Sequence, residues 1–376
     1  MKNKHILTLV PLMSVVLSGC GGVKSWKDNL GDYEYTMEFH QNFNILQMTD
    51  IHWSVTSSTT LSRRYLQKVI EETDRKIKAE QGDNAKIDLI ELTGDQFMLA
   101  NTYHVKTFIK FFEEMAIEHG FMYTAIWGNH DRHGVYNPNW LSETFRQAEH
   151  CIYLEPEDDL YGRSNFVINL NQGGVTKWQL ANLDSGASFS ETAVSPFRDY
   201  DYIRKEQVDW WVAEHDRVGT SVPTIAYYHI PQQDNLEAWN KIHKDGAAYK
   251  HKFFKLEGFA DNGNERYASQ FIKVGRENGL KAAFMGHAHN VDWTVDYDGV
   301  VIGLGVKTGT ELYYAHIDVG STDEAMAEGV ASIGATENFD LIGASLVTIK
   351  DDANFDLEHL YLNERTGGDF VRWVKW

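Results

Sequence analysis

The chain has 376 residues and a formal net charge of −19, with 35 Lys and Arg residues against 54 Asp and Glu residues. Because so acidic a surface repels nucleic acid, nucleic-acid binding is not expected. An anionic substrate would need local positive charge of the kind that bound metal ions supply. With 43% hydrophobic residues and only two cysteines, the fold depends on a packed core and not on a disulfide framework.

The first residues are typical of an export signal. Lys2 and Lys4 precede an apolar stretch at 6–17, which is too short to be a stable transmembrane anchor. The stretch ends in Leu17-Ser18-Gly19-Cys20, which resembles the lipobox of bacterial lipoproteins; the alternative is an ordinary secretory signal followed by a chance cysteine. The resemblance implies cleavage before Cys20, acylation of that residue, and attachment of the exported protein to a membrane of the cell envelope, at the periplasmic or the surface face.

These observations divide the chain. We predict a signal peptide at 1–19, a lipidated cysteine with a polar spacer at 20–37, and a folded domain at 38–376. Lipidation of Cys20 would leave Cys151 as the only free thiol, which excludes an intramolecular disulfide.

Hydrophobic periodicity predicts alternating strands and helices in the first half of the folded domain. The expected elements, in chain order, are a strand at 43–48, a helix at 60–79, a strand at 87–92, a helix at 102–118 and a strand at 121–127. This alternation favours an α/β fold with a mostly parallel sheet, in which ligands bind at the carboxyl ends of the strands.

The second half is richer in strands. Hairpins are expected at 165–170 with 176–183 and at 291–297 with 300–306, helices at 203–218 and 265–278, and single strands at 222–228, 280–285 and 341–349. Residues 231–263 are long enough to form a cap over a site, with a surface insertion as the alternative. The acidic stretch at 318–340, rich in Gly, Ala and Ser, is expected to be a mobile surface loop.

Polar side chains follow five of these strands. They are Asp50, His52, Asp95, Asn129, His130, His229, His287 and His289. Carboxylate and imidazole groups without thiolates suit Zn, Mn or Fe, and the Asp-x-His and His-x-His pairs have the period of two that points both members the same way on extended backbone. One ion needs three or four ligands, so this number predicts two metals with Asp95 between them. Alone, each motif is more often a turn or a core histidine; their joint occurrence at strand ends favours a site.

The series Asp50-x-His52, Gly94-Asp95, Gly128-Asn129-His130-Asp131, His229 and Gly286-His287-x-His289 resembles the calcineurin-like metallophosphoesterase superfamily, over residues 43–306. Leu183-Asp184-Ser185-Gly186, Gln207-x-x-Trp210 and Lys307-Thr308-Gly309 are similar to its purple-acid-phosphatase-like branch. The resemblance implies that residues 38–376 are a catalytic domain with a four-layer α/β/β/α sandwich, in which two mixed sheets are flanked by helices. Met98 stands where purple acid phosphatases have an iron-ligating tyrosine, and His52 where they have glycine, so a colourless site is expected.

The resemblance also implies a role for each residue. One metal would take Asp50, His52, Asp95 and His289, and the second Asp95, Asn129, His229 and His287, as Mn, Zn or Fe. His130 would face the leaving group, and Asp131 would hold its ring.

We expect first the hydrolysis of a phosphomonoester by attack of a metal-bridging hydroxide. Hydrolysis of phosphodiesters or nucleotides on the same site is the first alternative. A non-catalytic surface binding lipoprotein is the second.

Several polar and aromatic residues next to the motifs are candidates for substrate contacts. Arg132, His133 and His104 flank the motifs, as do Tyr103 and Tyr228, and each is a candidate to contact a phosphate. Each is equally well a solvated or a packing residue. The oligomeric state is left open.

Overall fold

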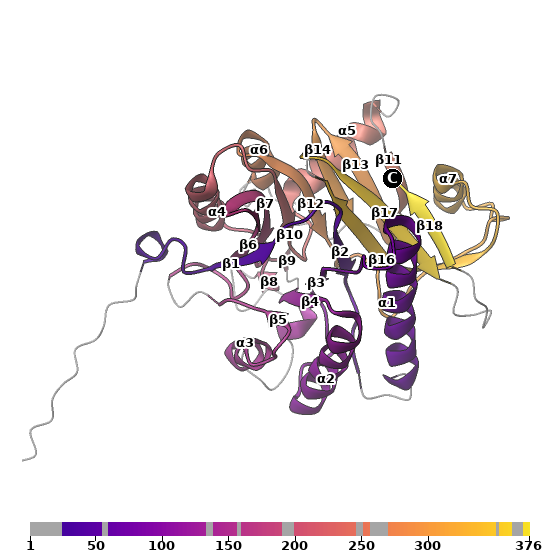
Figure 1. Cartoon of the computed structure of the whole chain (residues 1–376). Coiled ribbons are helices and arrows are strands. Elements are labelled where there is room, and N and C mark those ends of the chain that lie inside the picture. The colour runs from indigo at the N-terminus through magenta and orange to yellow at the C-terminus, as the bar shows by residue number, and fades with distance from the viewer. Residues whose placement is uncertain are drawn as a thin grey trace, which may run out of the picture.

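The computed structural model describes residues 25–54, 59–132, 138–155, 159–189, 199–245, 251–255, 270–350, 353–362 and 371–376. Two eight-stranded sheets stack face to face, and helices cover their outer faces (Figure 1). This is the mixed α/β sandwich that the resemblance implied. The expected signal peptide and Cys20 lie outside the described residues. No helix in the described part of the chain is both long and apolar enough to cross a bilayer.

The first sheet has the order β18-β17-β16-β2-β3-β4-β5, with β15 attached to β16. Its strands are β2 (Phe43–Met48), β3 (Leu89–Thr93), β4 (Met122–Ile126), β5 (Cys151–Ile152), β15 (His316–Ile317), β16 (Phe339–Ile349), β17 (Phe355–Leu362) and β18 (Val371–Lys375). The run from β2 to β5 is parallel and the C-terminal strands are antiparallel. Its outer face carries α1 (Thr59–Gln81), α2 (Thr102–His119) and α3 (Pro138–Arg146).

The second sheet has the order β1-β6-β7-β10-β12-β14-β13-β11. Its strands are β1 (Glu34–Glu38), β6 (Phe166–Gln172), β7 (Val175–Asn182), β10 (Thr224–Tyr227), β11 (His251–Lys255), β12 (Leu280–Met285), β13 (Val291–Tyr297) and β14 (Val300–Leu304). The central run from β7 through β10 and β12 to β14 is parallel. Helices α4 (Lys205–Val218), α5 (Gln233–Asp245) and α6 (Phe271–Glu277) lie on its side of the sandwich, and β8 (Ser188–Phe189) pairs with β9 (Asp199–Tyr200) apart from it.

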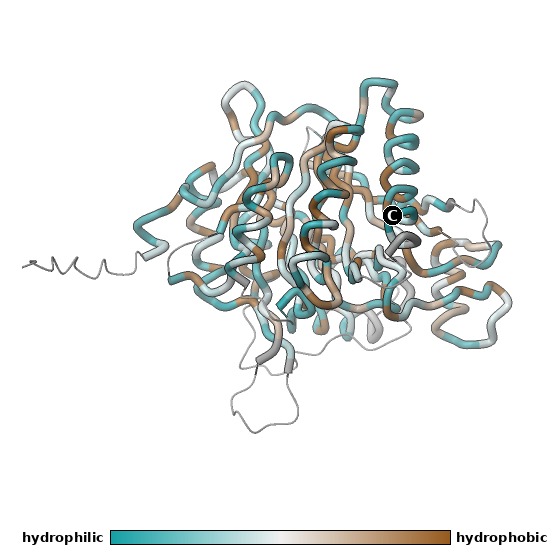
Figure 2. Tube along the Cα trace, turned by 90° about the horizontal axis from the view of Figure 1, so that it is seen from below, coloured by the Kyte–Doolittle hydropathy of each residue, from teal (hydrophilic) through white to brown (hydrophobic). Residues whose placement is uncertain are grey.

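The core lies between the sheets and also between the sheets and the helices that cover them. Figure 2 shows hydrophobic residues (brown) gathered mainly in the interior of the chain trace. Contacts join the layers directly: the Trp178 indole donates to the Lys350 carbonyl at 3.0 Å, and Phe284 meets Phe355 edge to face. A polar row interrupts this core. Gln47, Glu91 and Thr124 are register partners on neighbouring strands of the first sheet, and all three are fully buried. Because Gln47 donates to the Met285 carbonyl of the second sheet, the row faces the interior of the sandwich.

The N-terminal spacer is shorter than expected. A 3-10 turn at Trp26–Asp28 places the Trp26 ring in the core, and the Trp26 amide donates to Asp159 at 3.1 Å. Strand β1 then pairs with β6, so the folded domain begins near Trp26 and not at residue 38. Two buried aromatic residues, Trp26 and Tyr33, outweigh the polar composition of this segment.

The acidic stretch at 318–340 is not a mobile loop; that expectation was wrong. It contains α7 (Glu324–Ile333), whose first turn is capped by Asp323, which accepts from the Met326 amide at 2.9 Å. Gly334 ends the helix with a left-handed φ of 62°. The alanines that made this stretch resemble a loop are strong helix formers once both ends are capped.

Residues 231–263 are, where described, part of the scaffold. Strand β11 extends the second sheet by pairing with β13, and Asp234 of α5 accepts from the Ile272 amide at the start of α6 at 2.7 Å. The cap and the surface insertion both remain predictions, because 246–250 and 256–263 lie outside the described residues. The helix expected at 265–278 is described as α6, from Phe271 to Glu277.

Candidate metal centre

Five strands end at one edge of the sandwich, and each end carries residues of the expected site. Strands β2, β3 and β4 come from the first sheet, and β10 and β12 from the second. Three groups of side chains there have ligand atoms within 4.8 Å of one another: Asp50, His52 and His289; Asp95, His229 and His287; His52, Asp95 and His130. The carboxyl ends of the strands thus form one cluster, as expected for this class of fold.

The first group surrounds a single point. His52 Nε2 and His289 Nε2 lie 3.0 Å apart, and His289 Nε2 is 3.4 Å from Asp50 Oδ1. Asp50 Oδ1 is buried and has no hydrogen-bond partner, although its neighbours are two imidazole nitrogens. Buried polar atoms are normally satisfied, so these nitrogens and this oxygen fit a cation held between them.

Asp95 belongs to the second group and also approaches His52 of the first. Asp95 Oδ2 is 3.4 Å from His229 Nε2 and 3.8 Å from His52 Nε2, and His229 Nε2 is 3.3 Å from Asn129 Oδ1. One carboxylate oxygen therefore reaches both groups. Nitrogen and oxygen donors without sulfur suit Zn, Mn or Fe in this group as well.

Hydrogen bonds fix which atom of each side chain faces the cluster. Asp50 Oδ2 accepts from the His287 amide at 2.8 Å, which leaves Asp50 Oδ1 facing inward. Asp95 Oδ1 accepts from the His130 amide at 2.7 Å, and His229 Nδ1 bonds the Thr93 carbonyl at 2.9 Å. Such outer contacts orient metal ligands and select the histidine tautomer.

The backbone at the cluster is strained. Asp50, His52, Asp95 and His287 all have positive φ, between 52° and 78°. The left-handed region disfavours residues with a Cβ, and such residues collect at functional sites. Asp50 and His52 therefore reach the cluster through left-handed turns, not on extended backbone with a period of two, although they do lie in one group as expected.

Two glycines make the close packing possible. A Cβ on Gly94 would lie 2.3 Å from His229 Nδ1, and one on Gly128 would lie 2.2 Å from Asp95 Oδ1. Neither atom can move without displacing a donor of the cluster. Glycine is required at both positions by close approach.

Electrostatics separates the histidines. Burial is the largest single influence on His229 and lowers its pKa, but Asp95, the charge of Asp50 and the Thr93 carbonyl together raise the pKa to about 9. Burial and the charge of His229 lower the pKa of His287 to about 3. A metal ion at this position would compete with a proton for the His229 nitrogen.

Asp131 does not hold the ring of His130. Its Oδ2 accepts from the Gly128 amide at 2.8 Å and its Oδ1 from the Phe97 amide at 2.9 Å. The carboxylate therefore fixes the loop that carries Asn129 and His130 and acts on His130 only through the backbone. The His130 ring itself is half-buried and meets the His52 ring edge to face, with centroids 5.0 Å apart.

The expected substrate contacts are mostly packing residues. Arg132 pairs with Asp184, and the His104 ring is buried against the Leu99 carbonyl at 2.8 Å. Tyr228 is fully buried and donates to Asn235, whereas Tyr103 is exposed. His133 lies outside the described residues.

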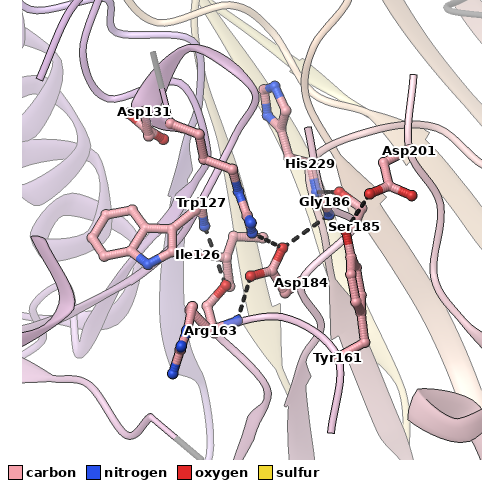
Figure 3. A network of polar contacts seen from close by, with 12 residues as sticks. Ile126, Trp127, Asp131, Tyr161, Arg163, Asp184, Ser185, Gly186, Asp201 and His229 are labelled. Carbon is pink, nitrogen blue, oxygen red and sulfur yellow. Dashed lines mark hydrogen bonds and ion pairs between the residues drawn. The ribbon is translucent and has the colours of Figure 1, made fainter. Parts of the chain in front are cut away.

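Asp184 is the centre of a supporting network behind the cluster (Figure 3). It accepts from Arg132 and from the backbone amides of Arg163 and Gly186, while Ser185 Oγ accepts from the His229 amide at 3.3 Å. The Leu183-Asp184-Ser185-Gly186 motif thus helps to position His229 from outside the cluster.

The other two motifs act in the same way. Gln207 donates to the Asp184 carbonyl at 2.8 Å, and the buried Lys307 ammonium donates to the Asp50 carbonyl at 2.5 Å. Sequence reasoning did not assign a role to Ser185 or Lys307, although the motifs that contain them were the available signal.

Known proteins match this part of the chain. Residues 43–291 fit the family model described as calcineurin-like phosphoesterase. Two Arabidopsis thaliana proteins, named probable inactive purple acid phosphatase 28 and 29, are 26% and 25% identical over 309 and 311 residues, which is 72% of this chain in both cases and 71% and 73% of theirs. Phosphatase DCR2 of Saccharomyces cerevisiae is 24% identical over 215 residues, 54% of this chain and 36% of that protein. The family match spans more than half of the sequence and includes every donor of the cluster, so this chain belongs to the calcineurin-like phosphoesterase family.

Proposed function

We propose that this protein is a dinuclear metal-dependent phosphoesterase that hydrolyses phosphomonoesters. The observation that carries the proposal is the position of Asp95 Oδ2, 3.8 Å from His52 Nε2 and 3.4 Å from His229 Nε2. A carboxylate that reaches two separate donor groups suits two ions and not one.

We assign the donors to two ions as the family resemblance implied. One ion would take Asp50, His52, Asp95 and His289, and the other Asp95, Asn129, His229 and His287, with Mn, Zn or Fe as the candidate metals. Met98 stands in place of an iron-ligating tyrosine, so the loaded protein is expected to be colourless.

When bound, such an ion pair supplies a Lewis acid and a water of lowered pKa. The residues of the chain do the rest. Asp95 keeps the His130 amide in place, and the half-buried His130 ring stands beside His52 where a leaving group can reach it. His130 would stabilise or protonate the departing oxygen, as a general acid does. Asp131 holds the Gly128 and Phe97 amides and so keeps this loop in one conformation.

Two alternatives remain in competition. Phosphodiester or nucleotide hydrolysis would use the same donors. A non-catalytic binding role is consistent with the word "inactive" in the names of two relatives. Against it, all seven donors and His130 are present here, whereas a site that had lost its function would be expected to have lost some of them.

The test is hydrolysis by residues 21–376, stripped of metal and reloaded with Mn, Zn or Fe. Restored turnover of para-nitrophenyl phosphate over the bis ester would support the proposal, and preference for the bis ester would favour the diesterase. No turnover with two metals bound per chain would indicate a specialised substrate or the binding role. A chain that binds no metal would refute the dinuclear site and both hydrolase proposals.

We further propose that the protein is an exported lipoprotein anchored through Cys20. The support is the short apolar stretch and the Leu17-Ser18-Gly19-Cys20 sequence. Cys20→Ser is expected to move the protein from the membrane fraction to the soluble fraction, and an unchanged distribution would contradict the anchor.

A further inference from the structure

Among the described residues of the candidate metal centre, two rings are partly exposed. Asp50, His52, Asp95 and His229 are at most 1% exposed, whereas His130 and His287 are half-buried. A substrate must approach past these two rings, so its leaving group must lie among the residues that surround them.

Two exposed tyrosines lie on this approach. The Tyr200 ring, at the end of β9, meets the His287 ring nearly at right angles with centroids 4.3 Å apart. The Tyr313 ring, in the segment after β14, meets the His289 ring with centroids 4.7 Å apart. Their exposed fractions are 37% and 56%.

Each tyrosine contacts a row of imidazole rings. One row runs from Tyr313 through His289 and His52 to His130, and the other from Tyr200 through His287 to His229. In each row the tyrosine has the largest exposed fraction of all the rings. The two donor groups are thus each bordered by one phenol ring.

The neighbouring cations are already engaged. Arg132 pairs with Asp184, the Lys307 ammonium donates to the Asp50 carbonyl, and Arg204 pairs with Asp201 at 2.9 Å. Within the described residues, the entrance therefore offers aromatic surface where a second phosphate would need positive charge.

We propose that Tyr200 and Tyr313 determine specificity by stacking on an aromatic leaving group, so that the preferred substrates are phosphate monoesters carrying an aromatic ring. The inference rests on the proposed phosphoesterase function and names its substrate class. Aromatic rings attract one another in tilted and edge-to-face arrangements with centroids 4.5–7 Å apart, and an exposed ring beside the centre offers such a partner. The aromatic ring can belong to a phenol bonded directly to phosphate or to the base of a nucleoside monophosphate.

The experiment compares phenyl phosphate, a nucleoside monophosphate and glycerol phosphate on the metal-loaded mature chain. The variants are Tyr200→Ala, Tyr313→Ala and the two Tyr→Phe changes, with Tyr35→Ala on the edge strand β1 as a matched exposed control. Each alanine change is expected to lower kcat/KM for the aromatic ester about two- to tenfold, mainly through KM, and to spare glycerol phosphate. Phenylalanine should retain the preference. Each variant is compared with the wild type on the same ester, so the different intrinsic reactivities of the esters cancel.

The outcomes separate the sources of the ring and the two proposals. A loss confined to phenyl phosphate identifies a phenolic ester, and a loss confined to the nucleotide identifies a base. Equal losses for all three esters, or none, would overturn the specificity role.

If no ester is hydrolysed, binding of phenylphosphonate against methylphosphonate is measured by calorimetry on the metal-loaded chain. Tighter binding of phenylphosphonate than of methylphosphonate, lost in both alanine variants, would support aromatic recognition by Tyr200 and Tyr313 although the hydrolase proposal fails. Equal binding of the two phosphonates would refute aromatic recognition by these tyrosines.

Discussion

Glu91 should make the free energy of unfolding depend on pH. The side chain is fully buried in the polar row between the sheets, and neither carboxylate oxygen has a hydrogen-bond partner. Burial alone raises the pKa of Glu91 well above its ordinary value of 4.5. Burial raises the pKa of the Tyr227 phenol on the second sheet, and the charge of Glu91 raises it further. A protonated carboxyl is the form that this environment accepts.

The sign and size of the effect follow from proton linkage. Above pH 4.5 the unfolded chain loses the Glu91 proton, while the folded chain keeps it up to the raised pKa. The stability that this group contributes is complete below pH 4.5 and is lost as the pH rises through that window. Within the window the free energy of unfolding should fall by about 1.4 kcal/mol per pH unit on account of this residue.

Glu91→Gln removes the titration and keeps the shape. Urea unfolding is measured between pH 5 and pH 8 in excess chelator, so that metal binding does not add its own pH dependence. The wild type should lose stability relative to the variant as the pH rises, whereas Glu118→Gln, an exposed change on α2, should follow the wild type. Parallel curves for the wild type and Glu91→Gln would refute a protonated carboxyl in the core.

Four further changes test the site and the scaffold. His130→Ala should keep both metals and lose about 10²–10⁴-fold in kcat, and metal content and turnover measured on one sample decide this. Asp95→Ala should lose metal, and full occupancy by elemental analysis would contradict a shared carboxylate. Arg132→Ala leaves the buried Asp184 unpaired and should lower stability to urea by about 3 kcal/mol, with partial recovery on adding Asp184→Asn. Asp323→Ala removes the α7 cap and should lower stability by about 1 kcal/mol at unchanged activity.

The strands and the donors could be predicted because both depend on local patterns. Strand β2 was expected at 43–48 and lies there. Asp50 and His52 follow it, and they were expected in the site because parallel strands present their carboxyl ends at one edge of a sheet. The left-handed backbone at both residues could not be predicted, since it depends on contacts from other strands, such as the Lys307 ammonium at the Asp50 carbonyl.

The failures have the opposite origin. Arg132 looked available to a phosphate because its partner, Asp184, is 52 residues away in the sequence. Tyr200 and Tyr313 attracted no notice because an exposed tyrosine has no motif, and only the fold brings them to His287 and His289. Composition misled at α7, where alanine was counted as a loop residue although Asp323 and Gly334 cap the helix.

The burial of Trp26 limits how long the proposed lipid tether could be. If Cys20 carries the acyl chains, only six Cα–Cα steps separate the membrane attachment from a ring fixed in the core. Fully extended chain spans at most about 3.6 Å per residue, so the domain would hang within about 20 Å of its anchor. With so short a connection the domain could neither move far from its anchor nor reorient freely. It would encounter mainly esters that come close to the head-group layer.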